Sequence, residues 1–168
     1  MRDDSMTQPQ STNQAIEIRP ATPSDANQVA AFNRAMAEET EGLHLDGAVL
    51  AAGVREALAD PSRSRYFVAV VDGTVVGQTM FTTEWSDWRN GFFWWIQSVY
   101  VTPSHRRRGV FRALYDHVRS LARAQPDVVG LRLYVHEHNT RAMRTYERLG
   151  MTTTAYRLCE KDWSGDRR

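Results

Sequence analysis

The sequence has very little cysteine and no long apolar run. Cys159 is the only cysteine among 168 residues, so an internal disulfide is excluded and the composition suits a reducing compartment. We expect this lone cysteine to be a small buried hydrophobe and assign it no chemistry. The longest apolar stretches, residues 48–54 and 92–96, are far shorter than the roughly 20 residues that a membrane-spanning helix needs. We therefore predict a cytoplasmic protein without membrane association.

The sequence also lacks an excess of charge of either sign. The formal net charge is +1, so no global field attracts the chain to nucleic acid or to an anionic membrane. With 42% hydrophobic residues the chain is apolar enough to fold. Residues 1–14 are polar and contain no apolar segment of the secretory type, so we expect a loose tail there. We predict one domain at residues 15–164 and a short C-terminal tail at residues 165–168.

Hydrophobic periodicity and turn signals predict an α/β fold. The first half starts with a short strand near residues 16–18, a helix capped by Ser24 or Asp25, and a helix over residues 46–58 that Pro61 ends. A meander follows, with strands at residues 66–71, 74–83 and 92–101 and turns at Asp72-Gly73 and at residues 89–91. The second half reads as helix 109–124, strand 128–135, helix 139–149 and one or two strands within 151–160. This order indicates a mixed, mostly antiparallel sheet with helices on both faces.

A basic loop joins the strand at residues 92–101 to the next helix. Its three consecutive arginines, residues 106–108, precede Gly109 at the helix start. Backbone N–H groups at a helix N-terminus and the helix dipole favour an anion, and a glycine lets the backbone approach a phosphate closely. The loop matches neither the Walker-type nor the dinucleotide glycine pattern. The competing interpretation is a solvated surface turn.

This loop resembles the acetyl-CoA loop of the GNAT superfamily of N-acetyltransferases, Arg/Gln-x-x-Gly-x-Gly/Ala, preceded by a strand with Val-x-Val-x-Pro. Arg106 and Gly109 match the loop pattern, whereas Phe111 stands where the family prefers glycine or alanine. The upstream matches are Val99, Val101 and Pro103. A second segment, residues 139–151, is similar to the family's Asn-x-x-Ala-x-x-x-Tyr-x-x-x-Gly-Phe, with methionine at the last position. The two motifs occur in the family's order, so we identify the chain as a member of that superfamily.

The resemblance implies how acetyl-CoA, the acyl donor, would be bound without a metal. The family's sheet contains a splayed pair of parallel strands, and the pantetheine arm lies in the gap. Main-chain atoms of Val99, Tyr100 and Val101 would hold this arm. The pyrophosphate would rest on the loop and the helix start, namely on Arg106, Arg107, Arg108, Gly109, Val110, Phe111 and Arg112.

The second motif implies two further roles. Tyr146 occupies the position of the tyrosine that protonates the leaving thiolate as general acid. Asn139 occupies a position that commonly contacts the cofactor. The alternatives are an aromatic side chain packed on the sheet for Tyr146 and an ordinary helix N-cap for Asn139.

The acceptor is expected to be a primary amine, of a small molecule or a protein, that attacks the thioester directly. The amine must lose a proton, yet residues 92–98 contain no carboxylate that could accept it. We name four carboxylates as candidates for the acceptor site or the base, with a solvated surface as the alternative for each: Glu39, Glu41, Glu84 and Asp87. His136 and His138 lack the additional ligands of a metal site. The sequence is also compatible with a homodimer.

Two functions of other classes remain open. The first is a non-catalytic acyl-CoA sensor on the same fold, because a fold does not determine a function. The second is a nucleic-acid-binding module, which the net charge near zero disfavours. The second rests on the arginines of one loop and helix, Arg106, Arg107, Arg108, Arg112, Arg119 and Arg123.

Overall fold

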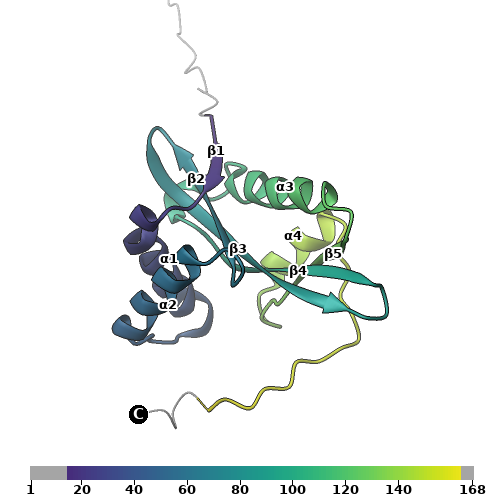
Figure 1. The fold of residues 1–168 in the computed structure, drawn as a ribbon. Coiled ribbons are helices and arrows are strands. Elements are labelled where there is room, and N and C mark those ends of the chain that lie inside the picture. The colour runs from purple at the N-terminus through teal and green to yellow at the C-terminus, as the bar shows by residue number, and fades with distance from the viewer. Residues whose placement is uncertain (1–14, 164–168) are drawn as a thin grey trace, which may run out of the picture. The chain divides into compact units, whose positions relative to one another are not determined.

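In the computed structural model, which describes residues 15–163, five strands form one sheet in the order β1-β2-β3-β4-β5 (Figure 1). Neighbouring strands are antiparallel from β1 to β4, and β4 and β5 are parallel. This is the predicted mixed, mostly antiparallel sheet. The strands are β1 (Glu17–Pro20), β2 (Arg65–Val71), β3 (Thr74–Ser86), β4 (Gly91–Val101) and β5 (Val128–Leu133).

The helices fall into two compact units of the chain, which divide after Tyr134 and are each described by themselves. The first unit contains α1 (Ala26–Glu41), α2 (Gly47–Ala59) and α3 (Val110–Arg123), with 3-10 turns at η1 (Pro23–Asp25) and η2 (Pro103–His105). The second contains α4 (Thr140–Arg148). The predicted tails, residues 1–14 and 165–168, lie outside the described residues.

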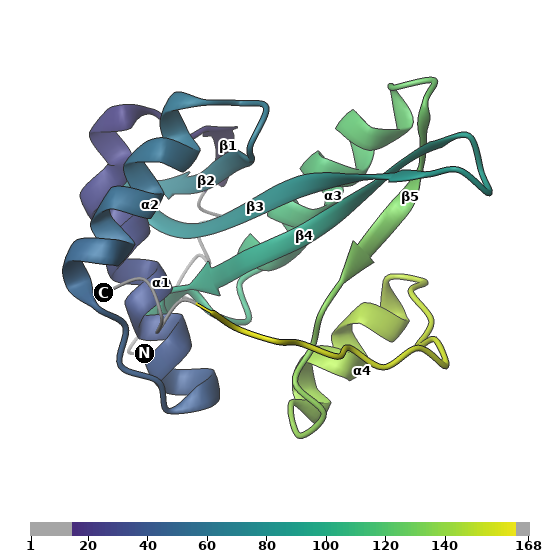
Figure 2. The ribbon, with the colours of Figure 1, turned by 60° about the horizontal axis from the view of Figure 1, so that its bottom comes forward.

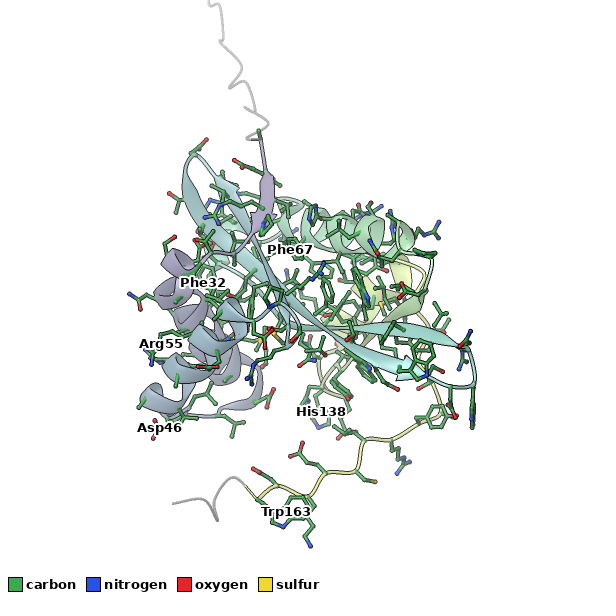
Figure 3. The ribbon with its side chains drawn as sticks, in the orientation of Figure 1. Phe32, Asp46, Arg55, Phe67, His138 and Trp163 are labelled. Atoms are coloured by element: carbon green, nitrogen blue, oxygen red, sulfur yellow. The ribbon has the colours of Figure 1, made fainter. Side chains whose placement is uncertain are left out.

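Helices cover both faces of the sheet, as predicted. Alternate residues of β2 point to opposite sides: Tyr66 and Val68 pack with residues of α1 and α2, whereas the Phe67 ring lies 4.8 Å from the His117 ring of α3. Figure 3 labels Phe67 beside α3 and Phe32 on α1. Three apolar side chains of α3 are almost fully buried, since Val110, Leu114 and Val118 have an exposed fraction of 2% or less. The core therefore consists of two layers of side chains, one on each side of the sheet.

Local signals place most element boundaries. The Asp46 carboxylate accepts hydrogen bonds from Ala48 N and Val49 N at 2.8 and 3.0 Å, so α2 begins just after its cap. Asp72 and Gly73 both have positive φ, 49° and 74°, as a tight two-residue hairpin requires. β3 runs three residues farther than predicted, because its pairing with β4 continues to the hairpin.

Asp25 differs from its predicted role at the start of α1. It holds the N-cap position, but its side chain turns back and accepts hydrogen bonds from Thr22 N at 2.7 Å and from both terminal nitrogens of Arg19 at 2.8 and 2.9 Å. The hydrogen bond from Arg19 and those from Thr22 lower the pKa of Asp25 from 3.8 to about 2. This carboxylate therefore ties β1 to the start of α1.

We expect Asp25→Asn to lower the free energy of unfolding by about 2 kcal/mol at neutral pH, since a shift of one pKa unit corresponds to roughly 1.4 kcal/mol. The lowered pKa means that the contribution is present above pH 3.8 and is lost as pH falls toward about 2. Urea unfolding of both proteins at neutral pH and at acidic pH measures this. A difference that does not shrink on acidification would contradict the ionic role of Asp25.

Two predictions for the C-terminal region are wrong. Residues 151–163, the described part after α4, form no strand, although residues 151–160 were predicted to contain one. Cys159 is exposed, not buried. Both expectations came from local residue preferences, whereas a strand requires hydrogen bonds to a neighbour and burial requires a covering layer. Gly150 does end α4 as predicted, with φ of 84°.

Candidate acyl-donor site

The parallel pairing between β4 and β5 stops halfway along β4. It runs from Phe92 opposite Val128 to Ile96 opposite Leu133. Beyond this point β4 continues to pair with β3 as far as Val101, and within residues 15–163 it has no β5 partner. The main chain at residues 97–101 therefore presents an open edge, the arrangement that the resemblance predicted for a splayed parallel pair.

A β-bulge lies where the two strands part. Gln97 is opposite Met80 and Tyr100 is opposite Gln78, so Ser98 and Val99 together face the single residue between. Ser98 has φ of 49°, a left-handed conformation that is uncommon outside glycine. A bulge bends its strand and redirects main-chain groups. The bulge thus helps β4 leave the direction of β5.

Buried polar side chains support this bulge. The fully buried Gln78 donates through Nε2 to Ser98 O at 3.3 Å and to Asn33 Oδ1 at 2.7 Å. Asn33 Nδ2 donates to Tyr66 Oη at 3.2 Å, and Tyr66 Oη donates to Ser98 Oγ at 3.3 Å. Left-handed backbone at a non-glycine residue persists when surrounding contacts determine it. The network therefore fixes the strand conformation beside the open edge.

This network was not predicted from the sequence. A signal existed, because Asn33 and Gln78 interrupt the apolar positions of a helix and a strand, where buried polar side chains are unusual. The partners could not be inferred, since Asn33, Tyr66, Gln78 and Ser98 come from α1, β2, β3 and β4.

The loop after β4 leads directly into the N-terminus of α3. Gly109 is the N-cap residue, with φ of 84°, and has no side chain that could cap the helix. The first helical hydrogen bond runs from Ala113 N to Gly109 O at 2.9 Å, so the N–H groups before it have no acceptor in the helix. Apart from the chain neighbours of Gly109, no atom of residues 15–163 lies within 4 Å of the position that its Cβ would occupy. The predicted anion site thus has an open approach.

A second glycine brings α3 close to the sheet. A Cβ on Gly77 of β3 would lie 3.1 Å from Val110 Cγ1 and 3.0 Å from Tyr100 O. A larger residue would push the first turn of α3 away from β4. Gly77 therefore helps hold the helix N-terminus beside the end of the open strand edge.

The Arg106 side chain is partly exposed and turns back onto β4 and α1. Its Nε donates to Val101 O at 2.8 Å, its Nη2 pairs with Glu39 Oε2 at 2.6 Å, and its guanidinium lies 5.4 Å from the centre of the Tyr100 ring. Tyr100 Oη donates to Glu39 Oε1 at 2.9 Å. Burial and the hydrogen bond to Glu39 raise the pKa of Tyr100. The structure thus brings together Arg106 and Tyr100, which were predicted to bind the acyl donor, and Glu39, which was predicted as a candidate for the acceptor amine site or the base.

The other arginines of the basic segment differ in their surroundings. Arg107 and Arg108 are exposed, and neither forms an ion pair with a residue between 15 and 163. Arg112 pairs with Asp116 at 2.6 Å, and Arg119 pairs with the same carboxylate at 2.9 Å. Arg107 and Arg108 therefore supply most of the positive charge that is available to a ligand at the loop.

The predicted acceptor carboxylates do not lie together. Glu84 of β3 lies opposite Phe93. Tyr100, the hydrogen-bond partner of Glu39, lies opposite Gln78, which comes six residues before Glu84 in the same strand. Six residues along a strand correspond to roughly 20 Å. Figure 2 shows α1 and α2 at one end of β3 and β4 and the hairpin at the other. Glu41 is exposed at the end of α1.

The carboxylates near the hairpin have partners of their own. Glu84 accepts from Arg132 Nη1 at 2.9 Å and from the Trp95 indole N–H. The Arg132 guanidinium lies 3.7 Å from the centre of the Phe93 ring. Asp87 accepts a hydrogen bond from Trp88 N at 2.9 Å in the exposed turn. Glu84 therefore links β3 to β5 across β4.

The second unit positions the two residues of the other motif. The Asn139 side chain accepts from Ala142 N at 3.1 Å, so Asn139 is the N-cap of α4. Burial raises the pKa of Tyr146 above 10.0, which keeps its phenol protonated at neutral pH. Tyr146 can therefore donate a proton under the conditions in which an amine reacts.

Residues 15–163 contain no group of three or more His, Cys, Asp and Glu side chains placed to hold a metal ion. No helix in that part of the chain has the length and apolar character needed to cross a membrane.

Comparisons with known proteins agree with this geometry. The model of the acetyltransferase (GNAT) family matches residues 29–151. A possible acetyltransferase from Clostridium difficile 630 is 45% identical, with a TM-score of 0.82 over 88% of this chain and 97% of that one. No curated protein matches.

Two more distant structures share the fold. A ribosomal-protein-alanine N-acetyltransferase from Brucella melitensis biovar Abortus 2308 is 19% identical, with a TM-score of 0.71 over 89% of this chain and all of that one (100%). A predicted acetyltransferase with acetyl-CoA from Clostridium acetobutylicum is 15% identical, with a TM-score of 0.73 over 88% and 96%. The family match spans the open β4 edge, the Gly109 loop and α4, and on this ground the chain belongs to the acetyltransferase (GNAT) family.

Proposed function

We propose that the chain is an acetyl-CoA-dependent N-acetyltransferase that transfers the acetyl group directly to a primary amine. The observation that carries the proposal is the continuity of the open β4 edge with the uncapped N-terminus of α3. An extended amide-containing arm fits the first, and a diphosphate fits the second. Family membership supports acyl transfer, and the names of two similar structures, which mention acetyl-CoA and alanine N-acetylation, support this donor and an amine acceptor.

The residues present fit CoA in two segments. Main-chain groups of residues 99–101 would hold the pantetheine arm, because β5 leaves their edge unpaired. N–H groups at the start of α3, with Arg107 and Arg108, would hold the diphosphate. Arg106 would act indirectly, since its side chain is occupied by Val101 O and Glu39.

In direct transfer the amine nitrogen bonds to the acetyl carbon, the carbon–sulfur bond breaks, and the thiolate leaves. Tyr146 would supply the proton to the sulfur, since its raised pKa keeps the phenol protonated. Glu39 and Glu84 are each held by an arginine, and Glu41 and Asp87 are exposed, so we propose that water takes the proton from the amine and that solvent returns a proton to the Tyr146 phenolate. The amine itself could belong to a small molecule or to a protein.

We further propose that residues 15–164 form the catalytic domain and that the protein works in the cytoplasm. The family match lies inside this range, and a single cysteine suits a reducing compartment. A nucleic-acid-binding function is less well supported, because Arg106, Arg112 and Arg119 already pair with carboxylates.

The test combines calorimetry with a turnover assay. We expect saturable binding of acetyl-CoA, and release of CoA thiol when one amine of a panel of polyamines, aminoglycosides, amino acids and peptides is added. Intact mass of the product should increase by one acetyl group. Binding without thiol release for the whole panel would favour the acyl-CoA sensor, and salt-dependent binding of DNA or RNA without acetyl-CoA binding would contradict the proposal.

A further inference from the structure

The Glu39 carboxylate of α1 lies 67 positions before the loop arginine that it binds. We infer that Glu39 is a positioning residue for the diphosphate-binding loop and that it acts on the acyl donor, not on the acceptor amine. The inference rests on the proposed function. It gives Glu39 a role toward the acyl donor, whereas the sequence suggested Glu39 as a candidate for the acceptor site or the base.

The two oxygens of this carboxylate have different donors. Oε1 accepts from Tyr100 Oη at 2.9 Å, and Oε2 accepts from Arg106 Nη2 at 2.6 Å. Tyr100 is the penultimate residue of β4, and Arg106 is the first arginine of the loop. One carboxylate thus fixes the strand end and the loop start relative to each other.

Arg106 transmits this restraint to the main chain of the loop. Its Nε donates to Val101 O at 2.8 Å, and its backbone N donates to Pro103 O at 3.3 Å. The next residue, Arg107, has φ of 67°, a left-handed conformation that persists at a non-glycine residue only where surrounding contacts hold the loop in place. Gly109 and the first turn of α3 follow directly. The direction of the N–H groups that would meet the diphosphate therefore depends on how Arg106 is held.

The same contacts make an acceptor role for Glu39 unfavourable. An incoming ammonium group would have to displace Arg106 or Tyr100 from the carboxylate, which would release the loop. The Glu39 and Arg106 side chains are 41% and 34% exposed, so solvent weakens their ion pair. We therefore expect a moderate effect on donor binding, not its complete loss.

The experiment compares Glu39→Gln with Glu38→Gln, a neighbouring exposed carboxylate that forms no ion pair within residues 15–163. Calorimetry measures the Kd of CoA and of pantetheine, which lacks the diphosphate. We expect Glu39→Gln to raise the Kd of CoA about fivefold, the size of a partly exposed ion pair, and to leave that of pantetheine unchanged. Glu38→Gln should change neither value.

A double-mutant cycle tests the route through Arg106. Arg106→Lys keeps the charge but cannot donate to Val101 O and Glu39 in the same geometry, so it should also weaken CoA binding. Adding Glu39→Gln to Arg106→Lys should cause little further loss, because both changes break one contact. Fully additive losses, an equal effect on pantetheine, or a CoA affinity of Glu39→Gln equal to that of Glu38→Gln would overturn the inference. CoA binding by the unaltered chain tests the proposed function separately, because it does not depend on Glu39 variants.

Discussion

Replacing Tyr146 by phenylalanine is expected to lower kcat by about 10²–10⁴, the usual contribution of a positioned general acid. The ring would remain and only the hydroxyl would be lost, so the affinity for acetyl-CoA should stay nearly the same. Thiol release measured at saturating acetyl-CoA and amine gives kcat, and calorimetry gives the affinity. A phenylalanine variant with full activity would leave Tyr146 as a packing residue.

A matched control and a pH profile sharpen this test. Tyr156→Phe removes a hydroxyl from an exposed tyrosine ten residues later and should leave kcat unchanged. Since burial raises the pKa of Tyr146 above 10.0, the phenol stays protonated as pH increases from neutrality. We therefore expect that ionisation of this phenol does not lower kcat at any pH below 10.0. Any fall of kcat in that range should also occur in Tyr146→Phe. A fall in kcat near neutral pH that disappears in Tyr146→Phe would show that the phenol loses its proton there, which would contradict the raised pKa.

Replacing Gly109 by valine is expected to weaken acetyl-CoA binding by at least about tenfold, equivalent to roughly 1.4 kcal/mol. A Cβ there would have no atom of the described part of the chain within 4 Å except in its chain neighbours, so the loss would not come from a clash with those residues. It would come from the φ of 84°, which a β-branched residue avoids, and from a side chain placed where a phosphate approaches. The backbone would shift and redirect the N–H groups at the start of α3.

The control for this variant is Gly73→Val in the β2–β3 turn. Gly73 has φ of 74°, and an added Cβ would likewise have no atom within 4 Å among the described residues beyond its chain neighbours, so the two substitutions impose similar strain. Both should lower the melting temperature to a similar extent, and only Gly109→Val should change the Kd of acetyl-CoA. Calorimetry with the folded variants measures this. Equal affinities in both variants would remove the loop from the site.

Features decided within a few residues could be read from the sequence. The Asp72-Gly73 turn and the helices predicted at residues 46–58 and 109–124 depend on backbone preferences and on the helical repeat, which neighbouring residues determine. The basic loop before Gly109 is of this kind too. Its chemistry follows from a strand end, a glycine and a helix start that are contiguous in the chain.

Features that join distant segments could not be read in this way. The strand predicted within residues 151–160 had the right residue types, but ladder hydrogen bonds require a neighbour that local preference does not provide. The bulge at Ser98 depends on Gln78, Asn33 and Tyr66, which three other elements bring to it.

The sequence by itself determined the order of the elements from β1 to α4, the prediction of an anion site at the Gly109 loop and the resemblance to one family. Only the tertiary structure decided which charges meet. It turned Arg106 toward Glu39, left Arg107 and Arg108 exposed, and separated Glu84 from the acidic end of α1. The physical reason is that side-chain partners depend on how packed elements bring distant residues within a few ångströms, and the spacing of residues along the chain does not contain that information.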